Sequence, residues 1–191
     1  MRKILITLFL LFCIISFLAA QEAEENNIKF SDLTSGSVIL YSSLEKLIYF
    51  LGTPDGVFVN HRFYCAENGK EKDTICFFNS IGYKNRRLTY WEHNDTVRLH
   101  NIYFDKKKGY RIFHPLAYFS KNLKMNYFTK VFNIPEERIW KVTGRSVPFK
   151  SKPNSIYYQI DFRNNENYCE EVITFYFNRQ GYLTAITFSI Y

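Results

Sequence analysis

Glycine is scarce in this 191-residue sequence, and the eight glycines stand singly rather than in a cluster. A glycine-rich phosphate-binding loop is therefore absent. The four histidines form no His-Glu-x-x-His motif, and no serine stands in a Gly-x-Ser-x-Gly elbow. The four cysteines include no Cys-x-x-Cys pair, so zinc-site spacing is missing as well. These absences leave no catalytic residue, metal site or cofactor to assign, and we expect a protein without enzymatic activity.

Long apolar runs are also absent, except at the N-terminus. Arg2 and Lys3 precede an apolar stretch over residues 4–18, and Ala19 and Ala20 then lead into a polar, acidic segment. This order is the layout of a secretory signal at residues 1–20. We therefore expect an exported protein, periplasmic or secreted, whose mature form does not span the membrane.

Two alternatives to a cleaved signal remain open. The first is an uncleaved anchor, although the apolar run is shorter than the ~20 residues that span a bilayer comfortably. The second is a lipoprotein with Cys13 as the lipidated residue, but Phe12 stands where a small residue is expected.

The charge of the chain is moderately basic. The formal net charge is +7, and the signal segment contributes two of these positive charges, which leaves +5 for the mature chain. Such a balance permits an acidic partner, an anionic membrane surface or a nucleic acid but selects none of them. Among possible partners we expect no nucleic acid.

Cys65 and Cys76 are candidates for a disulfide in an oxidising compartment. The segment between them is polar and contains Asn68-Gly69, a strong turn signal. Closing a loop of this size would stabilise the fold by roughly 3 kcal/mol in the chain-entropy model. Cys169 would then be left as a free thiol.

The clearest local pattern is a short helix over residues 43–51. Ser42 and Glu45 have the spacing of a capping box. Gly52 and Pro54 end the helix. The apolar stripe at i, i+3, i+4 and i+7 consists of Leu44, Leu47, Ile48 and Leu51.

Most of the remaining chain reads as strands. Residues 121–132 predict a second helix, with Ser120 as its cap. Leu123, Tyr127 and Val131 are expected to face inward, and Phe128 and Phe132 partly so. A turn is expected at Pro135, and a loop over 143–154. β-Branched and aromatic runs predict strands at 37–41, 57–64, 74–79, 88–91, 97–104, 110–113, 156–162, 171–177 and 182–191.

The sequence divides into a flexible acidic leader (21–35) and two halves (36–115 and 116–191). Each half has a short helix that ends shortly before a proline, followed by several strands and a Phe/Tyr-rich hairpin. The prediction is an α+β fold of short helices packed on an antiparallel sheet, built from two tandem related halves. That the two hairpins are alike through composition alone remains an alternative.

The segment 44–55, with Leu51-Gly52-Thr53-Pro54, resembles the helix-then-Leu-Gly-x-Pro signature of small bacterial envelope modules. These include the outer-membrane assembly lipoproteins of the SmpA/OmlA type, and tandem copies of the same shape form the β-lactamase inhibitory proteins. The second half lacks Leu-Gly before Pro135, and the lipidation signal is missing. The resemblance implies a helix-on-sheet fold that binds proteins and has no catalysis.

Candidate contact residues are the aromatic and basic positions Tyr90, Trp91, Lys107 and Tyr110. Tryptophan and tyrosine anchor interfaces because they bury a large area at low entropic cost. A buried place in a sheet is the alternative for these aromatic residues.

The functional prediction is an exported, non-enzymatic module that binds another envelope or extracellular protein. One alternative is binding of an anionic lipid or glycan surface through the lysine-rich loops at 84–87 and 106–108. Another is an exported hydrolase, in which His100 or His61 would have to face Cys169 or a carboxylate.

Overall fold

The computed structural model describes residues 27–67, 70–104, 109–166 and 169–190, without the side chains of 58–67, 70–78, 165–166, 169–170 and 190. The predicted signal segment at 1–20 and leader residues 21–26 lie outside the described residues. Among the residues that the structure does describe, no helix has the length and apolar character needed to cross a membrane.

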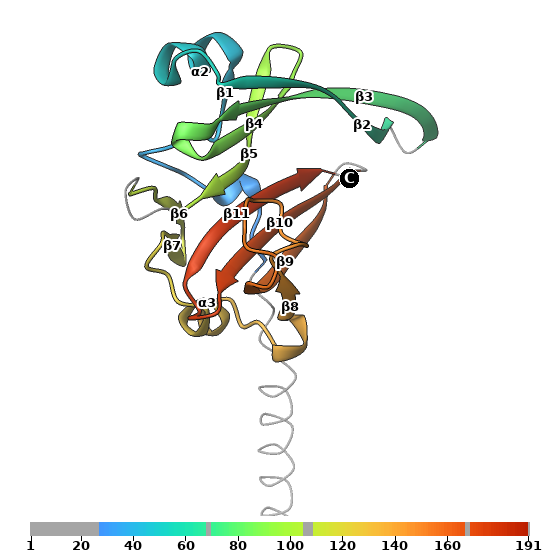
Figure 1. The fold of residues 1–191 in the computed structure, drawn as a ribbon. Helices are drawn as coiled ribbons and strands as arrows, with labels where there is room; N and C mark the ends of the chain where they lie inside the picture. The colour runs from blue at the N-terminus through green and yellow to red at the C-terminus, as the bar shows by residue number, and fades with distance from the viewer. Residues whose placement is uncertain (1–26, 68–69, 105–108, 167–168, 191) are drawn as a thin grey trace, which may run out of the picture.

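One antiparallel sheet forms the centre of the protein (Figure 1). Its strand order is β2-β3-β4-β5-β11-β10-β9-β8, and the short strand β1 pairs with β5. The strands span Tyr41–Ser43 (β1), Gly56–Glu67 (β2), Lys70–Tyr83 (β3), Leu88–His93 (β4), Thr96–Tyr103 (β5), Trp140–Thr143 (β8), Ile156–Glu166 (β9), Cys169–Asn178 (β10) and Leu183–Ile190 (β11). With helices α2 (Leu44–Leu51) and α3 (Met125–Val131), this is an α+β fold. Most predicted strands are confirmed, but the strand expected at 37–41 lies at 41–43 instead. Two short strands, Ala117–Phe119 and β8, were not predicted.

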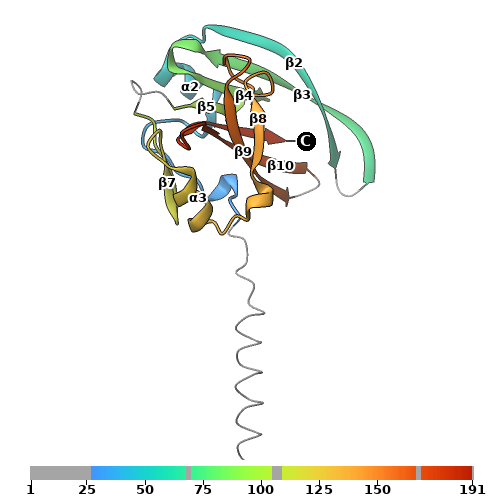
Figure 2. The same cartoon turned by 60° about the horizontal axis from the view of Figure 1, so that its bottom comes forward.

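The paired strands β2 and β3 extend beyond the rest of the sheet. β4 pairs only with Asn79–Tyr83 of β3, so the earlier residues of β3 pair with β2 alone. Figures 1 and 2 both show the resulting two-stranded arm projecting from the body. The predicted hairpin is therefore present, with longer strands than its sequence suggested.

The predicted disulfide falls on this arm. The backbone register pairs Cys65 with Thr74 and Cys76 with Phe63, so the two cysteines lie on neighbouring strands but not directly opposite each other. Their side chains lie outside the described residues, and the disulfide stays a prediction.

Strand β5 changes neighbours along its length. Its residues Asn101–Tyr103 pair with Ala185–Thr187 of β11, whereas Thr96–Arg98 pair with β1. The next residue of β11, Phe188, is contacted by a side chain of β5 instead of its backbone. His100 Nδ1 donates a hydrogen bond to the carbonyl oxygen of Phe188 (2.7 Å). The two parts of the sheet are thus joined by a short backbone register and a side-chain contact.

Helix α2 begins one residue later than the capping-box pattern predicts. Ser43, not Ser42, is the N-cap, and its hydroxyl oxygen accepts a hydrogen bond from the Lys46 amide (3.3 Å). Gly52 ends the helix with φ +82°, a conformation that favours glycine. Of the predicted apolar stripe, Leu47 is fully buried, but Ile48 is 40% exposed.

Helix α3 is shorter than predicted, and its inward face is centred on Phe128 and Phe132, which were expected to face inward only in part. The backbone of residues 123–125 is hydrogen-bonded to residues 181–183 at the start of β11, which delays the helix to Met125. Phe128 and Phe132 are fully buried, whereas Tyr127 is 53% exposed, so the prediction for Tyr127 was wrong. Ser120 caps no helix, and its hydroxyl accepts from the Asn122 amide instead.

Residues 27–35, predicted as part of a flexible leader, pack on the sheet. Ile28 is fully buried and Leu33 nearly so. The Phe30 ring lies 5.2 Å from that of Phe188 and 3.8 Å below the guanidinium carbon of Arg98. Apolar residues spaced along this polar segment anchor it, because their side chains are buried against the core.

The first predicted Phe/Tyr-rich hairpin has another pairing. β6 (Ile112–His114) pairs with β7 (Ala117–Phe119) in a separate two-stranded sheet, so Tyr110 does not pair back onto β5. The second hairpin is confirmed, with Gly181 at φ +78° in the turn between β10 and β11. The two hairpins therefore differ in structure.

His114 of β6 is expected to make the stability of the fold depend on pH. Burial lowers its pKa, an effect that Asp32 partly offsets, and its Nδ1 accepts a hydrogen bond from the Leu116 amide (3.2 Å). Because the folded pKa lies below the unfolded value of 6.5, the unfolded state binds the proton first as the pH falls. We expect the urea midpoint to drop between about pH 7 and pH 5. His114→Gln should flatten this drop, and an equal slope in both proteins would contradict the assignment.

Candidate functional site

The predicted contact residues do not form a surface. Tyr90 is fully buried, and Trp91 and Tyr110 are 6% and 9% exposed. Lys107 lies outside the described residues. The alternative of buried sheet aromatics is correct for Tyr90 and Trp91, and Tyr110 donates its hydroxyl proton to the carbonyl of Arg86 (2.6 Å).

The buried position of Trp91 follows from its neighbour across the sheet. The indole stacks on the His100 ring, with centroids 4.0 Å apart and an interplanar angle of 17°. Burial also raises the pKa of Tyr90 well above its ordinary value. These side chains stabilise the sheet and are not available to a partner.

Exposed aromatic side chains are found instead on helix α2. Tyr49 is 82% exposed and Phe50 60%, and their rings meet edge to face at 5.2 Å. Ile48, at 40%, adjoins them. Ile48, Tyr49 and Phe50 belong neither to the core nor to the residues packed against it. A group of exposed apolar side chains is characteristic of surfaces that bind other molecules.

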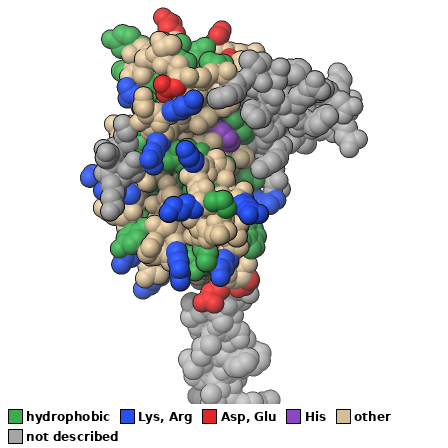
Figure 3. Space-filling model, viewed as in Figure 1, with side chains coloured by type: hydrophobic (Ala, Val, Ile, Leu, Met, Phe, Trp, Pro, Cys, Tyr) green, Lys and Arg blue, Asp and Glu red, His purple; other side chains and the backbone are tan. Residues whose placement is uncertain are grey.

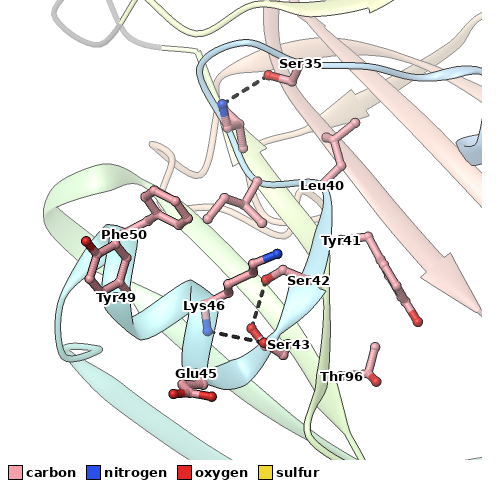
Figure 4. A pocket seen from close by; sticks show the side chains of 12 residues that line it. Ser35, Leu40, Tyr41, Ser42, Ser43, Glu45, Lys46, Tyr49, Phe50 and Thr96 are labelled. Carbon is pink, nitrogen blue, oxygen red and sulfur yellow. Dashed lines mark hydrogen bonds between the residues drawn. The ribbon is translucent and has the colours of Figure 1, made fainter.

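A groove lies between this helix and the chain that enters it (Figure 4). Its volume is about 1100 Å³, and Leu40 and Tyr41 line it from one side and Tyr49 and Phe50 from the other. Figure 4 shows Lys46 at its centre. The local turn is held by Ser35, whose hydroxyl accepts from the Val38 amide at 3.0 Å.

The groove carries apolar walls with isolated charges. Glu45 and Lys46 stand among its lining residues, and Tyr41 is 66% exposed. Aromatic residues are enriched at the centres of protein interfaces, whereas charged residues are depleted there. The aromatic side chains of the groove therefore fit an interface centre, and Lys46 adds a positive charge within it. We refer to Tyr41, Ile48, Tyr49 and Phe50 together with this concavity as the α2 groove.

Sequence reasoning missed the α2 groove, although a signal for it was present. The stripe of Leu44 and Leu47 already fills the inward face of the helix. Tyr49 and Phe50 fall outside that stripe on a helix of 3.6 residues per turn, and this places them on the outer face. Aromatic residues there are unexplained by packing.

The residues proposed for a hydrolase are not brought together by the described side chains. The ring of His100 is engaged with Trp91 and the Phe188 carbonyl. The side chains of His61 and Cys169 lie outside the described residues. Nowhere in the described part of the chain do three or more His, Cys, Asp or Glu side chains gather as a metal site would require.

The lysine-rich loops are only partly described. Lys84, Arg86 and Arg87 lie at an exposed 3-10 turn after β3, where Arg87 has φ +55°. Lys106, Lys107 and Lys108 lie outside the described residues. A joint surface of the two loops therefore stays a prediction.

Comparison with known proteins finds no counterpart. No protein-family model matches the chain, and neither a curated protein nor a solved structure does. The resemblance of residues 44–55 to envelope modules remains a prediction from that segment alone.

Proposed function

We propose that this chain is an exported, non-enzymatic protein-binding module that holds an apolar segment of its partner in the α2 groove. The observation that carries the proposal is the exposure of Tyr49 and Phe50 beside a groove of about 1100 Å³. Export rests on the layout of residues 1–20.

Burial of the exposed aromatic rings by the partner would supply most of the binding energy. Each aromatic side chain can remove some 150–250 Å² from water when a partner covers it. Residues of this type, grouped at the centre of a contact, account for most of the binding energy in protein interfaces. Because the walls are apolar, the affinity should depend weakly on salt, in contrast to binding through lysine loops.

We also propose that the two halves of the chain are related. Each half supplies a helix followed by a four-stranded meander, and the last strands of the two meanders, β5 and β11, pair at the centre of the sheet. This order supports the predicted duplication and agrees with what the resemblance to tandem envelope modules implies.

Affinity capture with paired variants tests the proposal. The bait is residues 21–191, exposed to an envelope extract of the source organism at physiological and at high salt. Tyr49→Ser/Phe50→Ser removes the groove rings, and Tyr118→Ser/Tyr127→Ser removes two rings of 56% and 53% exposure elsewhere. We expect a protein that wild type and the control retain at both salts and that the groove variant loses.

The identified partner is then titrated against all three proteins. Loss of two interface anchors should weaken binding by at least about 30-fold, and the control should bind like wild type. Equal capture by the groove variant would contradict the assignment, and so would a partner that high salt releases from wild type.

A further inference from the structure

A second concave site lies on the face of the sheet away from α3. Alternate residues of β9, β10 and β11 share one face. On the α3 side these are Phe162, Phe175 and Phe188, which belong to the main core. On the opposite side they include Asp161, Thr174 and Thr187, each 6–7% exposed. The α3 side of these strands is thus apolar. The opposite side, called the polar face below, combines these polar residues with a small apolar cluster that includes Tyr176 and Ala185.

Hydrogen bonds among its own side chains hold the polar groups of this face in place. Thr187 donates its hydroxyl proton to Asn101 Oδ1 (2.7 Å), and the Gln159 amide donates to both carboxylate oxygens of Asp161 (3.1 and 3.2 Å). Buried polar groups are expensive unless they are satisfied. A floor of this composition is well suited to a ligand that itself carries hydroxyl groups.

The loop between β8 and β9 covers one side of this face, in front of the sheet in Figure 1. Phe149 anchors it, with its ring 5.2–5.6 Å from those of Tyr103, Tyr157 and Tyr176. The loop leaves a cleft of about 550 Å³ beside it, within the range of small-ligand sites. Arg145 of the loop lines this cleft together with His100 and Arg163.

Arg163 also links the cleft to a neighbouring hollow. That hollow is lined by Asn27, Arg138, Trp140 and Arg163. The Trp140 side chain is 42% exposed, so an aromatic face is available at the end of the polar floor. We call the two hollows together the basic cleft.

The lining of the basic cleft is positive overall, with Arg138, Arg145 and Arg163 against the carboxylate of Asp161. From Arg138 to Lys152 the sequence has five lysine or arginine residues and no aspartate or glutamate. Figure 3, seen from this side, shows lysine and arginine side chains gathered over the middle and lower surface. Such a field attracts anionic ligands and raises their association rate.

We propose that the basic cleft binds an acidic oligosaccharide. The arginines pair with the carboxylates of the ligand, the Asp161 floor accepts its hydroxyl protons, and Trp140 stacks on the apolar face of a sugar ring. Arginine matches planar carboxylates in a bidentate way. A phosphatidylglycerol headgroup would pair with the arginines and has hydroxyl groups for the polar floor, but it has no sugar ring to stack on the indole. This site is separate from the α2 groove, so the two proposals succeed or fail independently.

Titration with an oligogalacturonate tests the proposal in residues 21–191, followed by tryptophan fluorescence and calorimetry. The fully methyl-esterified oligomer has the same rings without the charge and should not bind. Arg145→Gln/Arg163→Gln should weaken oligogalacturonate binding at least about ten-fold, because each lost bond involves a charged group. Arg111→Gln/Arg179→Gln removes the same charge from exposed positions outside the cleft and should leave the affinity within about two-fold.

Three results would overturn the proposal. The first is absence of binding by oligogalacturonate, and the second is equal binding of its methyl ester. The third is an equal loss of affinity in both double variants, which would indicate attraction to the overall positive charge of the protein and not to the cleft.

Vesicles containing phosphatidylglycerol test the lipid alternative in a separate experiment. Binding to these vesicles in place of oligogalacturonate would assign the cleft to lipid instead. Arg145→Gln alone, at an exposed position, serves if the double variant fails to fold.

Discussion

Phe128→Ala is expected to lower the free energy of unfolding by about 3–5 kcal/mol, the range for large-to-small changes of buried phenylalanine. Phe128 is fully buried on α3, and its ring centroid lies 4.6–6.0 Å from those of Phe119, Phe132, Phe162, Phe175 and Phe177. Alanine would leave a cavity among rings that cannot collapse into it, since each is held by the others. Urea unfolding followed by fluorescence measures the change.

Tyr127→Ala is the matched control, because it removes an aromatic ring from the adjacent, half-exposed position of the same helix. Its effect should stay within about 0.5 kcal/mol. Phe128→Leu keeps part of the volume and should lie between the two. If Tyr127→Ala proves as destabilising as Phe128→Ala, the inward face of α3 is assigned incorrectly.

Gly144→Ala is expected to destabilise the fold by about 1–3 kcal/mol, as overpacking of a closed site does. Gly144 lies at the neck of the loop between β8 and β9, where its amide donates to the Ser155 carbonyl oxygen (2.7 Å). An added Cβ would overlap with the carbonyl oxygen of Lys152 and stand 2.8 Å from Ser151 Oγ. The loop must shift to admit it, and Arg145 would move with the loop.

Gly36→Ala is the control for this prediction, since an added Cβ there meets nothing within 4 Å. That change should be neutral or slightly stabilising, because alanine restricts the unfolded chain. Thermal unfolding of the two variants separates the outcomes. Equal midpoints for both would show that the loop neck is not closed as described.

The elements whose signals are local could be predicted from the sequence. Helix α2 followed from its apolar spacing and from Gly52, whose positive φ the structure confirms. The turn before Gly181 followed from its composition. Such features depend on interactions between residues close together in the sequence, so tertiary contacts change them little.

Positions set by distant contacts could not be predicted. The hydrogen bonds from residues 123–125 to the start of β11 decide where α3 begins and which face it buries. β8 is too short to be recognised in the sequence, and it forms because β9 offers an edge. Phe30 finds its place only because β5 and β11 bring Arg98 and Phe188 together.

The candidate sites show the same division. Composition and residue spacing are enough to predict an aromatic-rich chain, a short amphipathic helix and the strands of an antiparallel sheet. The burial of individual aromatic residues depends on tertiary contacts, which bury Tyr90 and Trp91 and leave Tyr49 and Phe50 exposed. Residue type sets how favourable burial is, but the other surfaces that pack against a side chain determine whether it is buried. Those surfaces come from strands far apart in the sequence, as the central pairing of β5 with β11 shows.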